Sequence, residues 1–275
     1  MNREKDTFVF KQNKLKKRLS NGDSLFGVWI ETGSATNVEI LSPLGFDYLL
    51  IDLEHGQGDL NNLIHMLRAA QVSDTPCIVR VPWNDPIYLK RVLDAGADSL
   101  MIPMVENAGE ATAAVRACRY PPGGTRGYAA PAVRASNYGH VKDYMSKAND
   151  NLLIILQIET AAAVKNATTI ACVDGVDMVF LGINDMAGSI GRLEQLDHPD
   201  ARKLVRDAEA ALRSAGKMMG TVPSAGAGWR ELFESGYRLV PVASDVGLMR
   251  DAALACVDEQ HGHQKTSRPK RESGY

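Results

Sequence analysis

The sequence is poor in the features that mark secreted, membrane-spanning and disulfide-stabilised proteins. Residues 1–17 are charged and lack the apolar core of a secretory signal, and no apolar run approaches the ~20 residues of a membrane span. Cysteines are few and far apart, which suggests neither a disulfide framework nor a cysteine-based zinc site: Cys77, Cys118, Cys172 and Cys256. These absences predict a soluble, cytoplasmic protein.

An excess of charge of one sign is also missing. The formal net charge is −2, and no arginine-rich stripe is interleaved with aromatic residues. Such a surface gives no electrostatic reason for binding nucleic acid. What the chain has in abundance is apolar residues, at 45% of 275. This length is normal for one α/β barrel, which needs about 250 residues.

Short apolar runs alternate with longer segments of helical periodicity along nearly the whole chain. The runs are continuously apolar, as in strands that are buried on both faces. They predict eight strands, over residues 26–30, 48–52, 77–81, 99–103, 152–157, 178–181, 218–221 and 238–242. The segments between them predict eight helices, over residues 37–42, 60–72, 86–95, 108–117, 161–173, 200–215, 226–235 and 246–259.

Eight strands, each followed by a helix, predict a closed (β/α)8 TIM barrel. A doubly wound open sheet is the alternative, but it would need a glycine-rich phosphate turn after its first strand. Residues 31–34 read Glu-Thr-Gly-Ser, which is not that turn. We predict one TIM-barrel domain over residues 1–261 and a disordered polar tail over residues 262–275.

Ionisable and polar residues follow several of the predicted strands, and in such a barrel these positions converge on one rim. Glu159 and Asp185 end neighbouring strands, with Gln157 beside them. Carboxylate and amide oxygens suit Mg²⁺ or Mn²⁺, and two protein carboxylates leave coordination positions for water and a chelating 2-oxo acid.

Three further residues at this rim suggest how a proton and a developing negative charge are handled. Arg80 is expected to stabilise an enolate oxygen. His55 is the candidate general base, oriented by Asp52. A Schiff-base mechanism would need a lysine at a strand end, and the sequence places none there. The long connection of residues 120–150 is expected at the same face.

Taken together, these motifs resemble those of the HpcH/HpaI family of metal-dependent pyruvate aldolases. The resemblance spans residues 13–259 and is carried by residues 51–55 (IDLEH), 79–85 (VRVPWND), 120–127 (YPPGGTRG), 156–160 (LQIET) and 182–185 (GIND). The family often has Gly-Pro-Ala-Asp at the last motif, so Ile183 and Asn184 change the wall beside a substrate carboxylate.

The resemblance implies further roles. Gly182 and the main-chain amides around Asn184 would receive the carboxylate of pyruvate. Trp29 and Arg126 would line the pocket, and Asp94 would come from a neighbouring subunit. The family's barrels usually exchange their last helix and assemble as hexamers, so residues 246–259 would be the exchanged helix of a homo-oligomer.

The function predicted from these observations is cleavage of a 4-hydroxy-2-oxo acid to pyruvate and an aldehyde through a metal-stabilised enolate. Decarboxylation of oxaloacetate, or a reaction like that of macrophomate synthase, would use the same enolate. A lyase acting on a coenzyme A thioester lacks a basic patch for the phosphates, and a non-catalytic barrel would be expected to have lost a metal ligand or the arginine.

Overall fold

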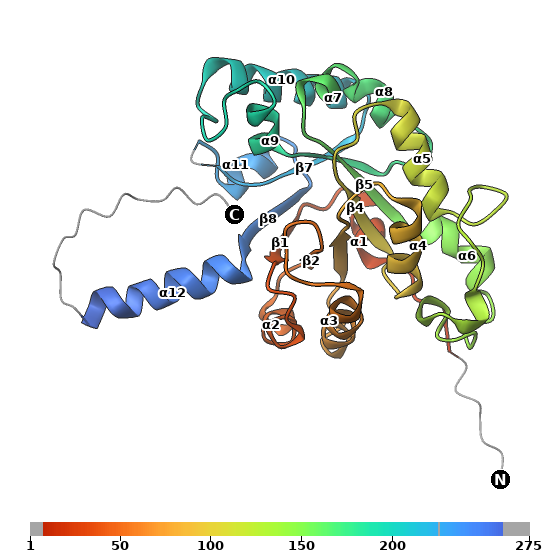
Figure 1. The fold of residues 1–275 in the computed structure, drawn as a ribbon. Helices are drawn as coiled ribbons and strands as arrows, with labels where there is room; N and C mark the ends of the chain where they lie inside the picture. The colour runs from red at the N-terminus through yellow and green to blue at the C-terminus, as the bar shows by residue number, and fades with distance from the viewer. Residues whose placement is uncertain (1–7, 225, 261–275) are drawn as a thin grey trace, which may run out of the picture.

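The eight apolar runs form eight strands, as predicted (Figure 1). The computed structural model describes residues 8–224 and 226–260, so the predicted tail at 262–275 lies outside the described residues. Adjacent strands are parallel, and β8 pairs with β1 to close the barrel. The TIM barrel is confirmed and the open sheet excluded. The strands are β1 (Leu25–Ile30), β2 (Tyr48–Asp52), β3 (Cys77–Arg80), β4 (Ser99–Ile102), β5 (Leu153–Ile158), β6 (Met178–Leu181), β7 (Met218–Thr221) and β8 (Leu239–Ser244).

All eight predicted helices are present, one of them in two pieces. The helix expected over residues 161–173 is interrupted at Asn166, whose side chain donates to the main-chain oxygen of Glu106 (2.8 Å). The helices are α2 (Ala35–Leu41), α3 (Leu60–Val72), α4 (Pro86–Asp94), α5 (Ala108–Cys118), α7 (Ala161–Lys165), α8 (Ala167–Ala171), α10 (Pro199–Ser214), α11 (Trp229–Glu234) and α12 (Asp245–Gln260).

Three further helices and three 3-10 turns were not predicted, because elements this short give little periodicity to read. They are α1 (Lys14–Ser20), α6 (Tyr144–Asn151), α9 (Ile183–Gly188) and the 3-10 turns η1 (Ser42–Leu44), η2 (Ala130–Ala132) and η3 (Arg134–Ser136).

Helix α1 lies at the N-terminal end of the barrel. It begins at Asn13, whose side chain accepts from the Lys16 N–H (2.9 Å) and donates to Ser99 Oγ at the start of β4 (2.8 Å). Leu15 and Leu19 of this helix are buried in the main core. This end of the barrel is therefore packed and hydrogen-bonded to the first residues of the strands.

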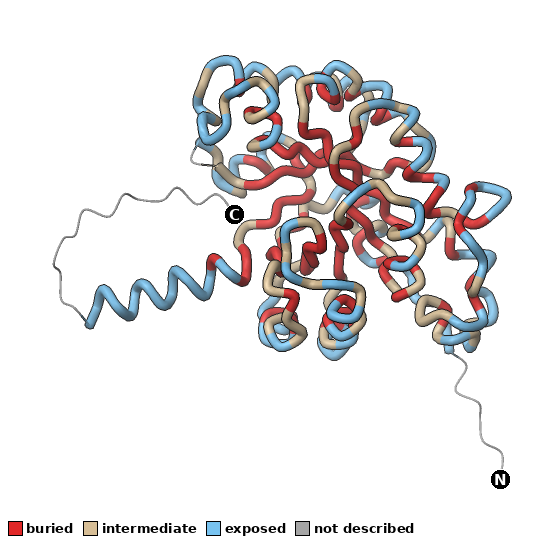
Figure 2. The backbone as a smooth tube through the Cα atoms, viewed as in Figure 1, coloured by how far each residue is buried: buried red, intermediate tan, exposed pale blue. Residues whose placement is uncertain are grey.

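The strands form the buried centre of the molecule (Figure 2). Every residue of β2 to β6 is buried, on both faces of the sheet. Parallel sheets require such double burial, which explains why the runs are continuously apolar.

Helix α12 departs from this pattern, because it projects away from the barrel instead of packing on it (Figures 1 and 2). Its first residue, Asp245, is buried and accepts hydrogen bonds from the loop after β1. From residue 248 to residue 260 every residue is exposed. The exposed side chains include five large apolar ones, Val246, Leu248, Met249, Leu254 and Val257.

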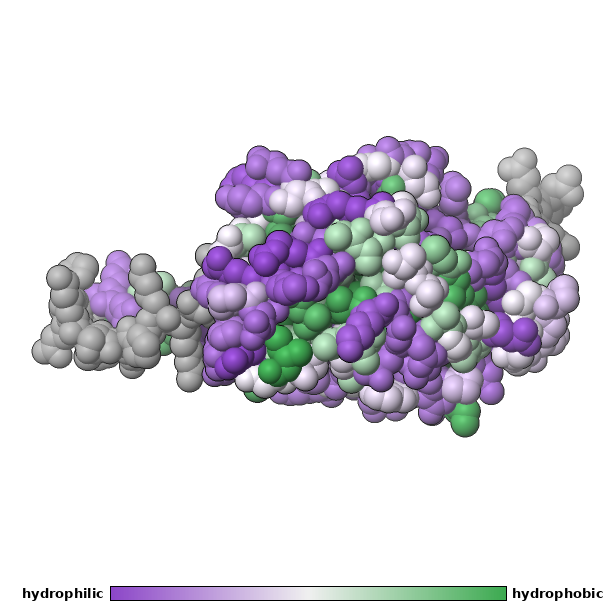
Figure 3. Space-filling model, turned by 90° about the horizontal axis from the view of Figure 1, so that it is seen from above, coloured by the Kyte–Doolittle hydropathy of each residue, from purple (hydrophilic) through white to green (hydrophobic). Residues whose placement is uncertain are grey.

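The surface is mixed in character. In the space-filling view, hydrophilic residues predominate around patches of hydrophobic ones (Figure 3). Among the helices of the described residues, none has the length and apolar character required to cross a bilayer.

Candidate active site

Five of the predicted site residues meet at the C-terminal rim of the barrel. Trp29 lies on β1, Asp52 and Arg80 are the last residues of β2 and β3, Gln157 lies on β5, and Glu159 follows the last residue of β5. All five are buried. Parallel strands end on one rim, so residues far apart in the sequence become neighbours there.

Arg80 and Asp52 form the centre of this group. The two residues are direct partners in the register between β2 and β3. The guanidinium donates to both carboxylate oxygens, from Nε to Oδ1 (2.8 Å) and from Nη2 to Oδ2 (2.7 Å). Its carbon Cζ lies 4.3 Å from the centre of the Trp29 ring. A bidentate pair under an aromatic ring fixes the orientation of the cation.

Glu54 is a member of the group that we did not predict. Its Oε2 lies 3.1 Å from Arg80 Nη1. Burial, together with the charges of Asp52 and Asp185, raises the pKa of Glu54 to about 7, although Arg80 opposes the shift. The sequence places Glu54 two residues after Asp52, close to the end of β2. That position alone does not show that the Glu54 side chain faces Arg80.

His55 lies at the outer edge of the site. Its side chain is 70% exposed, and its Nε2 is 4.0 Å from Glu54 Oε2. We expected Asp52 to orient the His55 ring, but among the described residues Asp52 accepts from the main-chain N–H groups of Glu54 (3.0 Å) and His55 (3.4 Å). The Asp52 carboxylate is bound by Arg80, and the Glu54 carboxylate lies beside the His55 ring.

Glu159 is held on both sides of its carboxylate. Its Oε2 accepts from the main-chain N–H of Met104 (2.8 Å), and its Oε1 accepts from Gln157 Nε2 (3.1 Å). Burial raises its pKa to about 7, and the charges of Glu54 and Asp185 add to the effect. Met104, a residue for which no sequence pattern indicated a role, has a left-handed backbone (φ 54°). Such conformations occur often at functional sites.

The segment after β6 completes the rim. A Cβ atom on Gly182 would lie 2.6 Å from Glu159 Oε1, so this position needs glycine for Glu159 to keep its place. Asn184 and Asp185 follow in the first turn of α9, where main-chain N–H groups have no partner within the helix. Asp185 is exposed at the mouth of the site.

The donor set fits a divalent cation bound through oxygen. Gln157 Oε1 is buried and has no hydrogen-bond partner among the described residues. The negative charges of Glu54, Glu159 and Asp185 oppose one another, and the positive charge of Arg80 offsets part of this repulsion. Excess negative charge of this kind favours Mg²⁺ or Mn²⁺. No three His, Cys, Asp or Glu side chains of the described residues cluster as a metal site, so Gln157, water and substrate would complete the coordination.

Two predicted residues lie at the other end of the barrel. Asp94 ends α4 and pairs with Arg126 (Oδ1 to Nη2, 2.7 Å), which is buried and lies over the Tyr120 ring (4.3 Å). The long connection that carries Arg126 follows α5 and leads into β5, so it belongs to the N-terminal end. Our placement of this loop at the active face was therefore wrong, and one copy of the chain does not bring Asp94 or Arg126 to the Arg80 group.

Sequence comparison identifies relatives over most of the chain. The profile of the HpcH/HpaI aldolase/citrate lyase family matches residues 25–252. A 2-dehydro-3,6-dideoxy-6-sulfogluconate aldolase of Pseudomonas putida is 44% identical over 238 residues, which are 86% of this chain and 93% of the relative. A 4-hydroxy-2-oxo-heptane-1,7-dioate aldolase of Shigella sonnei is 38% identical over 244 residues, 89% and 93% of the two chains.

Structural comparison gives the same result. The crystal structure of a HpcH/HpaI aldolase/citrate lyase family protein from Burkholderia cenocepacia J2315 matches with a TM-score of 0.86 and 37% identity. The match covers 91% of this chain and all of the other. Fold, rim residues and relatives agree, and the chain belongs to the HpcH/HpaI aldolase/citrate lyase family of carbon–carbon lyases.

Proposed function

We propose that this lyase is a divalent-metal-dependent aldolase that cleaves 4-hydroxy-2-oxo acids to pyruvate and an aldehyde. The observation that carries the proposal is the Arg80 guanidinium, which Asp52 holds in a bidentate pair beside the carboxyl group of Glu54. The two relatives act on different 2-oxo acids according to their names, so they support the class of reaction and leave the aldehyde to experiment.

Glu159 and Asp185, with Gln157 beside them, would hold Mg²⁺ or Mn²⁺. When bound, the ion supplies a Lewis acid for the 2-oxo acid. Gly182 leaves room for Glu159, and the main-chain N–H groups of the first turn of α9 can receive the substrate carboxylate.

The proton and charge steps fall to the residues of β2 and β3. His55 takes the proton of the C4 hydroxyl group, and the electrons of the C3–C4 bond pass to the 2-oxo acid as the aldehyde leaves. Arg80 provides positive charge for the enolate oxygen that develops, and Asp52 keeps its guanidinium in place. Protonation of C3 then gives pyruvate. Glu54, between Arg80 and His55, is placed to share the proton.

We also propose that the enzyme works as a homo-oligomer that exchanges α12. Apolar residues exposed along a projecting helix support this proposal, since they would be covered by a second copy. Asp94 and Arg126 could reach an active site only from such a copy. A hexamer and a cytoplasmic location remain predictions from the family resemblance and the composition.

The decisive experiment couples pyruvate release to lactate dehydrogenase, with 4-hydroxy-2-oxo acids and oxaloacetate as separate substrates. Each is tested with Mg²⁺, with Mn²⁺ and after EDTA, in the native enzyme and in Glu159→Gln. A matched control is Asp177→Asn, since Asp177 is a carboxylate at the other end of the barrel that accepts from the Ile154 N–H (2.8 Å).

We expect metal-dependent pyruvate release from the hydroxy-oxo acids, lowered about a thousandfold or more in Glu159→Gln and retained in Asp177→Asn. Turnover of oxaloacetate alone would instead make the enzyme a decarboxylase or a relative that captures the enolate. Activity that survives EDTA and Glu159→Gln would refute the metal-dependent mechanism.

A further inference from the structure

A second cavity, of about 550 Å³, lies far from the Arg80 group. Its walls come from the chain before α1, the last turns of α3, the turn between α4 and β4, and the segment from η3 to α6. All of these belong to the N-terminal end of the barrel, because they precede strands rather than follow them. The volume falls within the ~300–1,000 Å³ typical of small-molecule sites.

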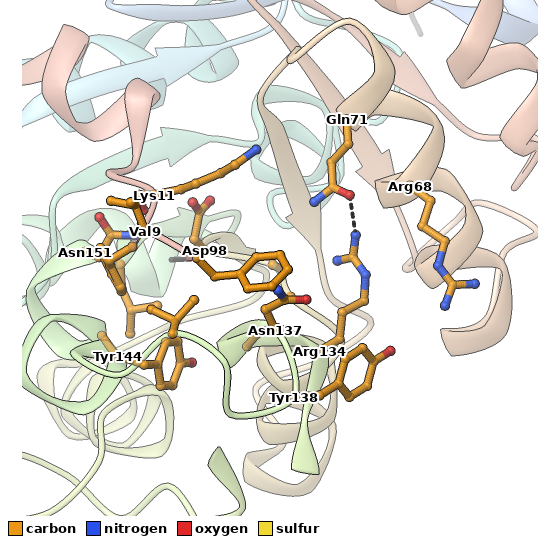
Figure 4. Close-up of a pocket in the computed structure, with 18 residues that line it drawn as sticks. Val9, Lys11, Arg68, Gln71, Asp98, Arg134, Asn137, Tyr138, Tyr144 and Asn151 are labelled. Carbon is orange, nitrogen blue, oxygen red and sulfur yellow. Dashed lines mark hydrogen bonds between the residues drawn. The ribbon is translucent and has the colours of Figure 1, made fainter. Parts of the chain in front are cut away.

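The charged residues of this cavity are mostly cationic. Arg134 donates from Nη1 to the Ala95 main-chain oxygen and from Nη2 to Gln71 Oε1, both at 2.9 Å. Figure 4 shows Arg134 reaching toward Gln71, with Arg68 on the same helix as Gln71. None of the described carboxylates pairs with Arg134 or Arg68. Their positive charge is therefore not neutralised by the surrounding fold.

The absence of a side chain at Gly96 leaves room for the Arg134 guanidinium, which lies close enough to Arg68 for the two positive charges to repel each other. A Cβ atom on Gly96, which has a left-handed φ of 104°, would overlap Arg134 Nη1. Burial, followed by the charge of Arg68, lowers the pKa of Arg134. An anion between the two guanidiniums would relieve this repulsion, and guanidinium groups bind carboxylate and phosphate in bidentate fashion.

The rest of the lining is largely apolar. Tyr138 and Val141 lie on the same segment as Arg134, and Phe8 and Phe10, from the chain before α1, also line the cavity. Tyr138 is 54% exposed and has a left-handed φ of 55°. The acidic residue of the lining, Asp98, lies on the side of Lys11 and Asn151 in Figure 4, and its side chain accepts from Ser99 Oγ (2.9 Å).

We propose that this cavity is a second binding site, for a small organic anion. Its carboxylate or phosphate group would lie between Arg68 and Arg134, and its apolar body would pack against Tyr138 and Val141. The proposal does not depend on the chemistry at the Arg80 group, since no residue is shared between the two sites.

The test is isothermal titration of the full-length protein, in EDTA and at low ionic strength, with phenyl phosphate and benzoate as probes. Inorganic phosphate lacks the apolar body and benzamide lacks the charge, so both should bind more weakly. The better of the two anionic probes identifies the preferred acidic group. We expect its Kd to rise about tenfold in Arg134→Gln and about threefold in Arg68→Gln.

Arg206→Gln is the matched control, because Arg206 is an exposed arginine on α10 outside the cavity and should leave the Kd unchanged. Arg68→Gln guards against a folding defect in Arg134→Gln, since the Arg68 side chain makes no hydrogen bond or ion pair with the described residues. Pyruvate release should persist in Arg68→Gln. Absence of binding by both anionic probes, equal Kd values in all variants, or loss of binding in Glu159→Gln would overturn the proposal.

Discussion

At the N-terminal end of the barrel, charged side chains are distributed in pairs around α1: Lys16 lies 3.2 Å from Asp177, and Arg18 bonds to both Asp23 (2.9 Å) and Asp47 (2.6 Å). At the C-terminal end, Arg80 faces two carboxylates, and Glu159 lies close enough to Glu54 for each charge to oppose the other.

The comparison shows that charges of opposite sign are paired around α1, whereas carboxylates gather around Arg80. The pairs join α1 to the turns that precede the strands. Carboxylates gathered at the C-terminal end weaken the unliganded fold, and a bound cation would relieve that cost. Functional sites are often less stable than their surroundings for this reason.

Replacing one arginine at each end gives the largest expected contrast. Arg80→Lys keeps the charge but loses the bidentate bond to Asp52, so kcat should fall about a hundredfold or more while KM changes little. Arg238→Lys is the control, because Arg238 precedes β8 and donates to Ser24 Oγ (3.0 Å). Steady-state pyruvate release measures both variants, and an equal loss in the two would remove the distinction between the ends.

A smaller effect is expected on the pH dependence of stability in EDTA. The pKa values of Glu54 and Glu159 are about 7 in the folded enzyme, above the ordinary value of a glutamate, so the unfolded chain loses these protons first. The free energy of unfolding should therefore fall as pH rises from about 4.5 to about 7, by about 3 kcal/mol for each of the two groups, and then level off.

Urea denaturation at several pH values in this range measures the decrease in the free energy of unfolding. The decrease should be smaller in Glu159→Gln, since an amide has no proton to lose in this range. Asp177→Asn, at the other end, should leave its slope unchanged. If native enzyme and Glu159→Gln gave parallel curves, the carboxylates of the rim would not be the source of the pH dependence.

The smallest effect concerns the N-terminal end. Asn13→Ala removes the N-cap of α1 and the bond to Ser99 Oγ, so the free energy of unfolding should fall by about 1–2 kcal/mol. The value of kcat should not change, because the site lies at the other rim. Urea denaturation and the pyruvate assay on the same preparation measure stability and kcat separately. A fall in kcat without a fall in stability would contradict a purely structural role for Asn13.

Most of the fold could be predicted from the sequence because each strand is buried on both faces and reads as a continuous apolar run. The convergence of Asp52, Arg80, Gln157 and Glu159 followed from the same pattern, since parallel strands end on one rim. Short elements escaped: α6 and α9 contain too few turns to show a period, and α1 is seven residues rich in lysine.

The arrangement within the rim was less accessible, because side-chain directions past the last strand residue depend on irregular backbone. Neither the contact of Glu54 with Arg80 nor the left-handed Met104 has a periodic signature. The placement of the loop that carries Arg126 was a different kind of error. A helix was predicted over residues 108–117, so the loop after it had to lie at the end where strands begin, and that inference was available from the sequence.

The anchoring of α12 links the outer helix to the rim mechanically. Asp245 accepts from the main-chain N–H groups of Glu31 (2.9 Å) and Thr32 (3.4 Å), the Thr32 hydroxyl and the Asn37 side chain (3.1 Å). These donors lie in and beside the loop that follows Trp29. Helix α12 is thus held at its first residue. A movement that tilts the helix would break these hydrogen bonds or displace the loop beside the active site.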